Sequence, residues 1–235
     1  MPEDIAQLNK KFASLHLKEA FEALASEQFK NPAFSTSFGM EDQVITHHIL
    51  SNKLPITVFT LDTGRLFEET YEVFNSTKKK YGASILTYFP DEKDIEKLIT
   101  TKGPFSFYND VEDRKECCHL RTVKPLQRAL SKVDLWITGL RAEQSFARQQ
   151  LNLFQYDETF NLIKFNPLTR WTLKEVKDYL NKHKVPQNKL HKKDYVSIGC
   201  APCTRPIQPG EDIRAGRWWW ETSKKECGLH LTSKA

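Results

Sequence analysis

Long hydrophobic runs are missing from this sequence. No stretch approaches the roughly 20 consecutive apolar residues that a membrane-spanning helix requires. The N-terminus begins Pro2-Glu3-Asp4 and continues as an amphipathic run, so it lacks the basic and then apolar order of a signal peptide. We therefore expect a cytoplasmic protein.

A strong excess of one charge is also missing. The chain has 35 Lys and Arg against 30 Asp and Glu, a formal net charge of +5. So small and dispersed an excess argues against a nucleic-acid-binding protein, but it is compatible with a small anionic substrate. With 39% hydrophobic and 28% charged residues over 235 positions, the composition is that of one large soluble enzyme domain.

Cysteine is scarce and unevenly distributed. The five cysteines form three groups, which are Cys117-Cys118, Cys200-Ala201-Pro202-Cys203 and the single Cys227. Because disulfides rarely persist in the cytoplasm, cysteines in such a protein favour metal binding or catalysis. Four of them suit a metal site, and the fifth suits a nucleophile.

Short apolar runs alternate with helical patterns over the first 183 residues, which is typical of a parallel sheet with helices on both faces. Thr172 is the expected N-cap of the last helix, with Glu175 at the capping-box spacing. We predict an α/β fold in a single domain, residues 1–235, with a helical N-terminal segment (1–30) and an irregular C-terminal tail (204–235) over the active site. The predicted helices cover 4–30, 42–50, 67–81, 91–99, 123–130 and 173–183, and the predicted strands cover 33–38, 56–61, 84–89, 135–138 and 162–165.

The two cysteine pairs admit more than one metal site. A Cys-x-x-Cys motif alone serves zinc sites, redox dithiols and iron–sulfur clusters. Adjacent cysteines such as Cys117 and Cys118 project in different directions, which makes a zinc tetrahedron awkward to close but suits the separate corners of a cubane. Four thiolates are the usual complement of a [4Fe–4S] cluster. Spacing therefore favours the cluster only modestly over zinc.

Cys227 has the surroundings of a reactive thiol. Lys224, Lys225 and His230 lie close in sequence and would lower the thiol pKa, while Gly228 leaves the sulfur accessible. The alternative is an unreactive cysteine on a frayed tail. The aromatic block Trp218–Trp220 just before it favours a tail that docks on the protein.

Three turns at the ends of predicted strands are suited to anions. The first joins a strand to a helix and offers hydroxyl groups, backbone amides and the positive end of the helix dipole. The second and third add arginines, and the tail supplies further planar donors for phosphate or sulfate oxygens. The residues concerned are Ser35, Ser37, Phe38 and Gly39 in the first turn, Asp62, Thr63, Gly64 and Arg65 in the second, Arg141 and Arg148 in the third, and Arg205, Arg214 and Arg217 in the tail.

Together these segments resemble the assimilatory sulfonucleotide reductases, and specifically their adenylyl-sulfate (APS) reductase branch. The resemblance runs in order from about residue 33 to residue 230. The matching runs are Ser37-Phe38-Gly39 with Glu41-Asp42, Leu61-Asp62-Thr63-Gly64-Arg65-Leu66, Cys117-Cys118 with Arg121, Gly139-Leu140-Arg141 with Gln144-Ser145 and Arg148, Cys200-Ala201-Pro202-Cys203, Arg214-Ala215-Gly216-Arg217-Trp218-Trp219-Trp220-Glu221 and Glu226-Cys227-Gly228-Leu229-His230.

The resemblance implies an adenine nucleotide α-hydrolase-like fold and a role for each group. Cys227, with His230 beside it, would attack the sulfur of APS and release AMP, and a thioredoxin-type dithiol would then release sulfite. A [4Fe–4S] cluster would be held by Cys117, Cys118, Cys200 and Cys203. The phosphosulfate would contact the Ser37 turn and Arg141, Arg148, Arg214 and Arg217, while residues 61–66 would line the adenosine pocket. Oligomeric state stays open between a monomer and a homo-oligomer.

One position departs from the family pattern, in which an Arg-Lys pair follows the adjacent cysteines. Here Arg121 is followed by Thr122, and Lys124 lies two residues further along, on the wrong face of a helix. Three alternatives remain. Reduction of the 3'-phosphorylated nucleotide PAPS is disfavoured by the paired cysteines, an ATP pyrophosphatase-type ligase by its different first loop, and a zinc-binding module by the anion-suited turns and Cys227, which it leaves unexplained.

Overall fold

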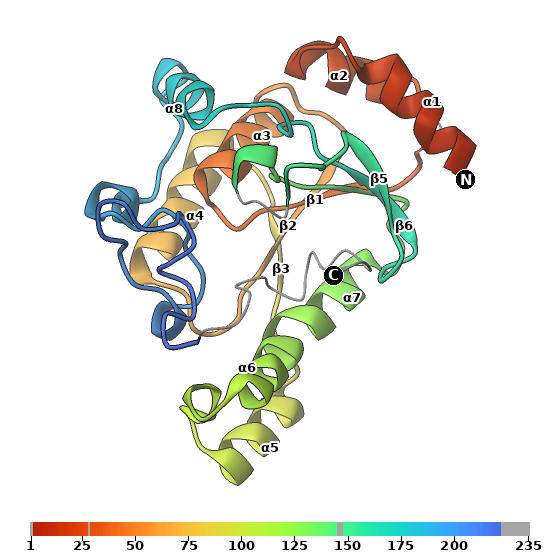
Figure 1. The fold of residues 1–235 in the computed structure, drawn as a ribbon. Coiled ribbons are helices and arrows are strands. Elements are labelled where there is room, and N and C mark those ends of the chain that lie inside the picture. Colours follow the sequence, from red (N-terminus) through yellow and green to blue (C-terminus); the bar gives the residue numbers. More distant parts are fainter. Residues whose placement is uncertain (1, 28, 145–147, 222–235) are drawn as a thin grey trace.

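The computed structural model describes residues 2–27, 29–144 and 148–221, in a single α/β domain (Figure 1). Its centre is a six-stranded sheet in the order β3-β2-β1-β4-β6-β5. All neighbouring strands run parallel except β5, which pairs antiparallel with β6. The strands are β1 (Pro32–Ser35), β2 (Thr57–Leu61), β3 (Leu86–Tyr88), β4 (Leu135–Ile137), β5 (Phe154–Asp157) and β6 (Leu162–Phe165).

Helices cover both faces of the sheet, because alternate strand residues point to opposite sides. Phe34 of β1 packs with the larger apolar cluster, which contains residues of α1, α2, α3 and α8. Its neighbour Ala33 packs with the smaller cluster, against Leu126 and Leu130 of α7. The helices are α1 (Pro2–Phe12), α2 (Leu17–Leu24), α3 (Met40–Ser51), α4 (Glu68–Tyr81), α5 (Glu92–Lys102), α6 (Val111–Cys118), α7 (Lys124–Leu130) and α8 (Leu173–Lys182).

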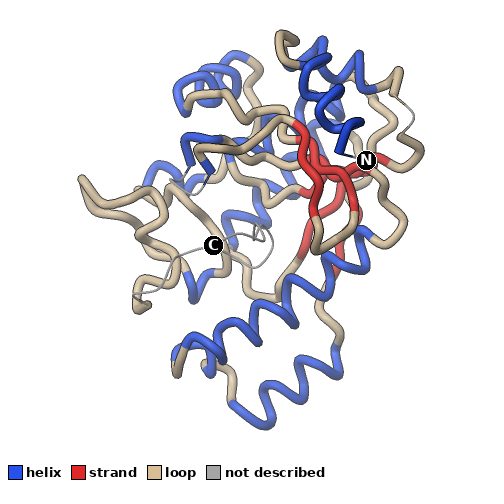
Figure 2. The backbone as a smooth tube through the Cα atoms, turned by 45° about the vertical axis from the view of Figure 1, so that its right-hand side comes forward, coloured by secondary structure: helices blue, strands red, loops and turns tan. Residues whose placement is uncertain are grey.

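Most of the predicted elements are confirmed, including the capping box of α8, in which Thr172 and Glu175 bond each other's backbone amides. Three differ. The predicted helix over 4–30 is divided into α1 and α2, the edge strand β5 was not predicted, and the helix expected to begin at 123 begins at Val111 and continues through a π-helical turn, His119–Val123, into α7. Figure 2 shows α5, α6 and α7 gathered at one end of the molecule, away from α1 and α2.

Beyond α8 the chain is irregular, with short 3₁₀ turns at Lys189–Lys193 and Ala201–Cys203. The described part of the predicted tail, residues 204–221, folds back toward the carboxyl ends of the strands. No helix in the described ranges is long and apolar enough to cross a membrane.

Candidate active site

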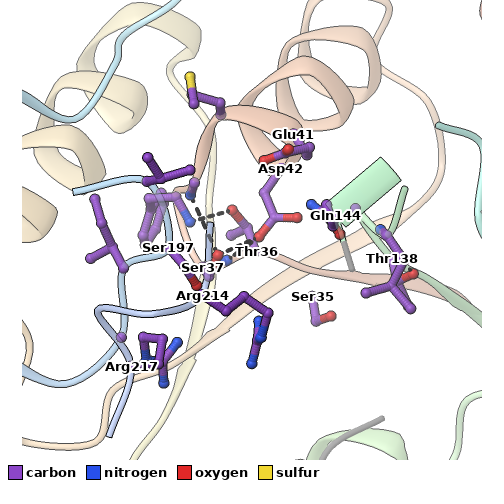
Figure 3. Close-up of a pocket in the computed structure, with 18 of the residues that line it drawn as sticks. Ser35, Thr36, Ser37, Glu41, Asp42, Thr138, Gln144, Ser197, Arg214 and Arg217 are labelled. Atoms are coloured by element: carbon purple, nitrogen blue, oxygen red, sulfur yellow. Dashed lines mark hydrogen bonds between the residues drawn. The ribbon is translucent and has the colours of Figure 1, made fainter. Parts of the chain in front are cut away.

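A cavity of about 580 Å³ lies at the carboxyl ends of β1, β2 and β4 (Figure 3). Open parallel sheets bind their ligands at this edge, because the loops after parallel strands meet there. The cavity wall combines the three predicted anion-suited turns with parts of the C-terminal region. The predicted site residues that line it are Ser35, Ser37, Phe38, Gly39, Thr63, Cys118, Arg141, Arg148, Cys200, Cys203, Arg214 and Arg217.

The first turn, between β1 and α3, brings helix amides to the cavity wall. Phe38 has a φ of +60°, which turns the chain sharply, and its buried ring stacks on Phe74 of α4 with centroids 4.8 Å apart. Gly39 is the N-cap of α3, and Gly39 and Met40 both line the cavity. The first-turn amides of α3, which have no partner within the helix, and the positive end of the helix dipole therefore lie where an anion would bind.

Asp42 connects the first turn to the third. Its carboxylate accepts hydrogen bonds from the backbone amide and the hydroxyl of Ser37, each 2.6 Å long. A Cβ at position 139 would collide with the same carboxylate, so Gly139 allows the two turns to pack together. Burial raises the pKa of Asp42 to about 6, and the hydrogen bonds from Ser37 oppose that rise.

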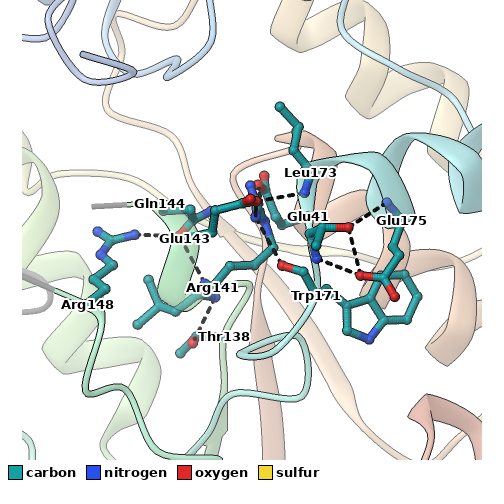
Figure 4. Close-up of polar contacts among 11 residues, drawn as sticks. Glu41, Thr138, Arg141, Glu143, Gln144, Arg148, Trp171, Leu173 and Glu175 are labelled. Atoms are coloured by element: carbon teal, nitrogen blue, oxygen red, sulfur yellow. Dashed lines mark hydrogen bonds and ion pairs between the residues drawn. The ribbon is translucent and has the colours of Figure 1, made fainter. Parts of the chain in front are cut away.

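Arg141, in the third turn, is held by two carboxylates (Figure 4). Its Nε donates to Glu41 at 2.9 Å, and its Nη1 donates to Glu143 at 2.7 Å and to the carbonyl oxygen of Trp171 at 3.1 Å. The Arg141 side chain is 4% exposed. The carboxylates of Glu41 and Glu143 balance the charge of Arg141. Because Glu41 lies in the first turn of α3 and Trp171 lies just before α8, Arg141 connects the N-termini of these two helices. Arg148, which also lines the cavity, donates to Gln144 at 2.6 Å.

Residues of the second turn line both the main cavity and a smaller pocket beside it. Thr63 lines the main cavity, and its hydroxyl oxygen lies 3.2 Å from the Cys200 sulfur. Asp62 instead accepts hydrogen bonds from the Gly64 amide and the Tyr71 hydroxyl, at 2.8 and 2.9 Å, so it shapes the turn. Arg65 points away from the main cavity, stacks over Phe107 at 4.8 Å and donates to the carbonyl oxygen of Pro104.

All four predicted metal ligands line one small pocket beside the main cavity. Cys117 and Cys118 come from the end of α6, Cys200 is the N-cap of the turn at Ala201–Cys203, and Cys203 ends that turn. Thr122 and three of these cysteines line both spaces, so the two adjoin. No three His, Cys, Asp or Glu side chains of the described ranges have the spacing that holds a single metal ion.

The surroundings of the small pocket are suited to an anionic group. Three guanidinium groups line it, from Arg65, Arg114 and Arg121. Arg65 Nη1 and Arg121 Nε are buried without a hydrogen-bond partner among the described residues, and the indole nitrogen of Trp220, which packs against the cysteines, has none either. Buried donors of this kind indicate an acceptor that belongs in the pocket. The sulfides and thiolates of an iron–sulfur cluster are such acceptors, so these residues fit that cofactor.

Comparison with known families shows which family the chain belongs to. The model of the phosphoadenosine phosphosulfate reductase domain matches residues 31–206, a span that includes the whole sheet and the four described cysteines. The chain belongs to this reductase family.

Individual reductases are similar to this chain over most of their length. The chain is 45% identical to an adenosine 5'-phosphosulfate reductase of Burkholderia cepacia, over 94% of this chain and 89% of the relative. It is 48% identical to one from Allochromatium vinosum, over 84% of this chain and 77% of that one. Among solved structures, a phosphoadenylyl-sulfate (PAPS) reductase of Candida auris in a phosphate complex superimposes with a TM-score of 0.75 at 29% identity, over 87% of this chain and 98% of that chain.

The more distant structural neighbours of this reductase show its fold. A flavin mononucleotide adenylyltransferase of Candida glabrata, in complex with FAD and pyrophosphate, superimposes with a TM-score of 0.55 at 14% identity, over 92% of this chain and 73% of that chain. The predicted adenine nucleotide α-hydrolase-like fold is confirmed.

Within this reductase Cys203 is a poor nucleophile. Burial raises the pKa of Cys203 to about 12, and the neighbouring Cys200 adds to the rise, so without a metal the thiol stays protonated at neutral pH. Cys227 and His230, the predicted catalytic residues, lie outside the described residues.

Lys124 does not replace the family's lysine, because its ammonium pairs with Asp94 at 2.7 Å.

Some residues in the reductase site and in the structure around it were missed in the sequence. Trp136 of β4 lines the cavity and donates its indole N–H to the Ser35 hydroxyl at 2.8 Å. Lys164 of β6 lies 4.7 Å from the Trp136 ring centroid and pairs with Asp157 at 2.6 Å. In the sequence, the one sign of this buried ion pair is a lysine, Lys164, inside a short apolar strand. The contact of Arg114 with Glu221, across 107 positions, has no local signature.

Proposed function

We propose that this chain reduces APS to sulfite and AMP, with Cys227 as the nucleophile and a cytoplasmic thioredoxin-type dithiol as the reductant. The meeting of three anion-suited turns with Arg214 and Arg217 at one cavity, beside the four-cysteine pocket, supports the proposal most strongly. The cavity volume of about 580 Å³ is that of a nucleotide-sized site. The name of the similar reductases in Burkholderia cepacia and Allochromatium vinosum specifies APS as their substrate.

The reaction divides one difficult reduction into two exchanges. The Cys227 thiolate attacks the sulfur of APS, so an S–S bond forms while the S–O bond to the phosphate breaks and AMP leaves with that electron pair. One thiolate of the dithiol then attacks the Cys227 sulfur, and sulfite leaves with the electron pair of the broken S–S bond. The second thiol resolves the mixed disulfide, so the dithiol ends oxidised and Cys227 returns as a thiolate.

The cavity residues stabilise the charge that develops on the departing phosphate. Arg214 and Arg217 line the cavity from the C-terminal region (Figure 3), and Gly39 and Met40 at the N-terminus of α3 line it as well. Donors placed in advance where charge develops are the largest contribution to catalysis in many enzymes. Leu61, Thr63 and Leu66 supply the apolar and hydroxyl contacts that suit adenosine.

Cys117, Cys118, Cys200 and Cys203 would hold a [4Fe–4S] cluster in the small pocket. The cluster would supply a fixed charge at the edge of the substrate cavity. The buried donors of Arg65 and Arg121 would hydrogen-bond its sulfur atoms. Zinc is the competing occupant. Anaerobically purified protein should be brown and contain iron, and colourless protein that contains zinc would refute the cluster.

Sulfite release from APS and PAPS, assayed in parallel with thioredoxin, tests the substrate. We expect faster turnover of APS. Equal or faster turnover of PAPS would reject APS as the preferred substrate and favour the PAPS reductase alternative, and no sulfite from either nucleotide would reject the proposed function.

A further inference from the structure

The start of the C-terminal tail is tied to the helix that ends in the cysteine pair. Arg114 of α6 lies three residues before Cys117, and its Nε and Nη2 donate to the two carboxylate oxygens of Glu221 at 2.8 and 2.9 Å. The two side chains are 6% and 4% exposed. A bidentate pair shielded from water in this way holds one geometry.

The same guanidinium group reaches the four-cysteine pocket. Arg114 lines that pocket together with Cys118. It also lies over the indole of Trp218, 4.7 Å from the ring centroid. Trp218 is 1% exposed, and its backbone amide donates to the carbonyl oxygen of Cys203 at 3.2 Å. Arg114 therefore lies against the pocket of the proposed metal ligands, the indole of Trp218 and the carboxylate of Glu221.

Trp218 of the aromatic block also contacts an arginine of the main cavity. Arg217, which lines the main cavity, lies over the same indole at 4.6 Å. It packs so closely on Gly199 that a Cβ there would collide with its guanidinium group. The cation that faces the substrate and the cation that faces the cysteines are thus positioned against one side chain, Trp218.

Glu221 lies close in sequence to Cys227, the proposed nucleophile. Glu221 precedes Cys227 by six residues. A chain of that length spans at most about 20 Å, so fixing Glu221 restricts the positions that the Cys227 sulfur can occupy.

We propose that the Arg114–Glu221 ion pair positions the nucleophile, by fixing the start of the segment with Cys227 to the helix that bears Cys117 and Cys118. This inference rests on the proposed function. Glu221 acts through the chain and does not touch the substrate. Loss of the pair then lowers the rate of attack on APS without lowering the affinity for APS or the metal content.

The test is single-turnover S-sulfonation of Cys227 in the Glu221→Gln variant. Metal-loaded protein is mixed with APS without dithiol, quenched and digested with trypsin, and the sulfonated peptide 226–234 is measured by mass spectrometry over time. We expect a rate about 10²-fold below that of the unmodified chain, as for a misplaced catalytic group. Iron content, visible absorbance and the Kd for APS, measured in a Cys227→Ser background, should not change.

Two further variants complete the test. Glu211→Gln is the matched control, because Glu211 forms a bidentate pair with Arg205 at 2.9 Å, yet neither residue lines either pocket. It should react at the rate of the unmodified chain. Glu221→Asp keeps the charge with a shorter reach and should give an intermediate rate.

Different results overturn different claims. Sulfonation of Glu221→Gln at the normal rate, with iron retained, would refute the positioning role. A fall in rate matched by an equal loss of iron or of APS affinity would assign the pair to general stability and also refute it. Absence of sulfonated Cys227 in the unmodified chain would instead refute the proposed function itself.

Discussion

Replacing Asp42 by Asn should remove a pH-dependent loss of stability. Desolvation raises the pKa of the Asp42 carboxyl from an ordinary value of 3.8 to about 6 in the folded protein. Between these values the folded state holds a proton that the unfolded state has released, so stability falls as pH rises through this window. The difference of about 2 pH units, at about 1.4 kcal/mol for each, gives a loss on the order of 3 kcal/mol that is complete above about pH 7.

The asparagine in the Asp42→Asn variant would not ionise, and its side-chain amide can still bond the Ser37 amide and hydroxyl. Urea unfolding of both proteins at intervals from pH 4 to pH 8 measures the effect. The variant should become more stable relative to the unmodified chain as pH rises, by up to about 3 kcal/mol, with no further change above about pH 7. Asp178→Asn, at an exposed position on α8, is the control and should leave the profile unchanged. Parallel profiles for Asp42→Asn and the unmodified chain would refute the burial argument.

Three other changes test separate parts of the protein. Gly199→Ala should push the Arg217 guanidinium group off its position and raise the KM for APS about 10-fold, equivalent to losing about 1.4 kcal/mol of binding, in steady-state assays; an unchanged KM would remove Arg217 from the anion site. Lys164→Met should lower the free energy of unfolding by about 3–5 kcal/mol because it strands the buried Asp157 carboxylate, whereas the double variant with Asp157→Leu should recover most of the loss in the same urea assay. Thr122→Lys should raise kcat/KM for APS by restoring a cation between the two pockets, and a lower kcat/KM at unchanged iron content would contradict this.

The position of the anion-suited turns could be predicted from the sequence because the topology of the strands determines where those turns lie. Ser35, Thr63 and Arg141 are far apart along the chain, but parallel strands bring the turns that follow them to one edge of the sheet. The capping box at Thr172 was readable because all of its partners lie within one helical turn.

Other features have no local pattern to read. The helix α6 shows no apolar stripe, because the residues it buries are Arg114 and Cys117. Its partner Glu221 is 107 positions away, so only the folded chain shows that a charged side chain is buried in place of an apolar one. Asp62 and Arg65 are predicted substrate-binding residues, yet Asp62 accepts a hydrogen bond from the backbone of its own turn and Arg65 lies over Phe107.

The central claim is that Cys227 takes the sulfonate group from APS. Its most direct test is to mix the protein with APS in the absence of any dithiol, then measure AMP release and map the modified residue by tryptic mass spectrometry. We predict a sulfonate on Cys227 in the peptide 226–234, with AMP released in an amount equal to the protein. AMP release by the Cys227→Ser variant, or a sulfonate on any other cysteine, would contradict the account.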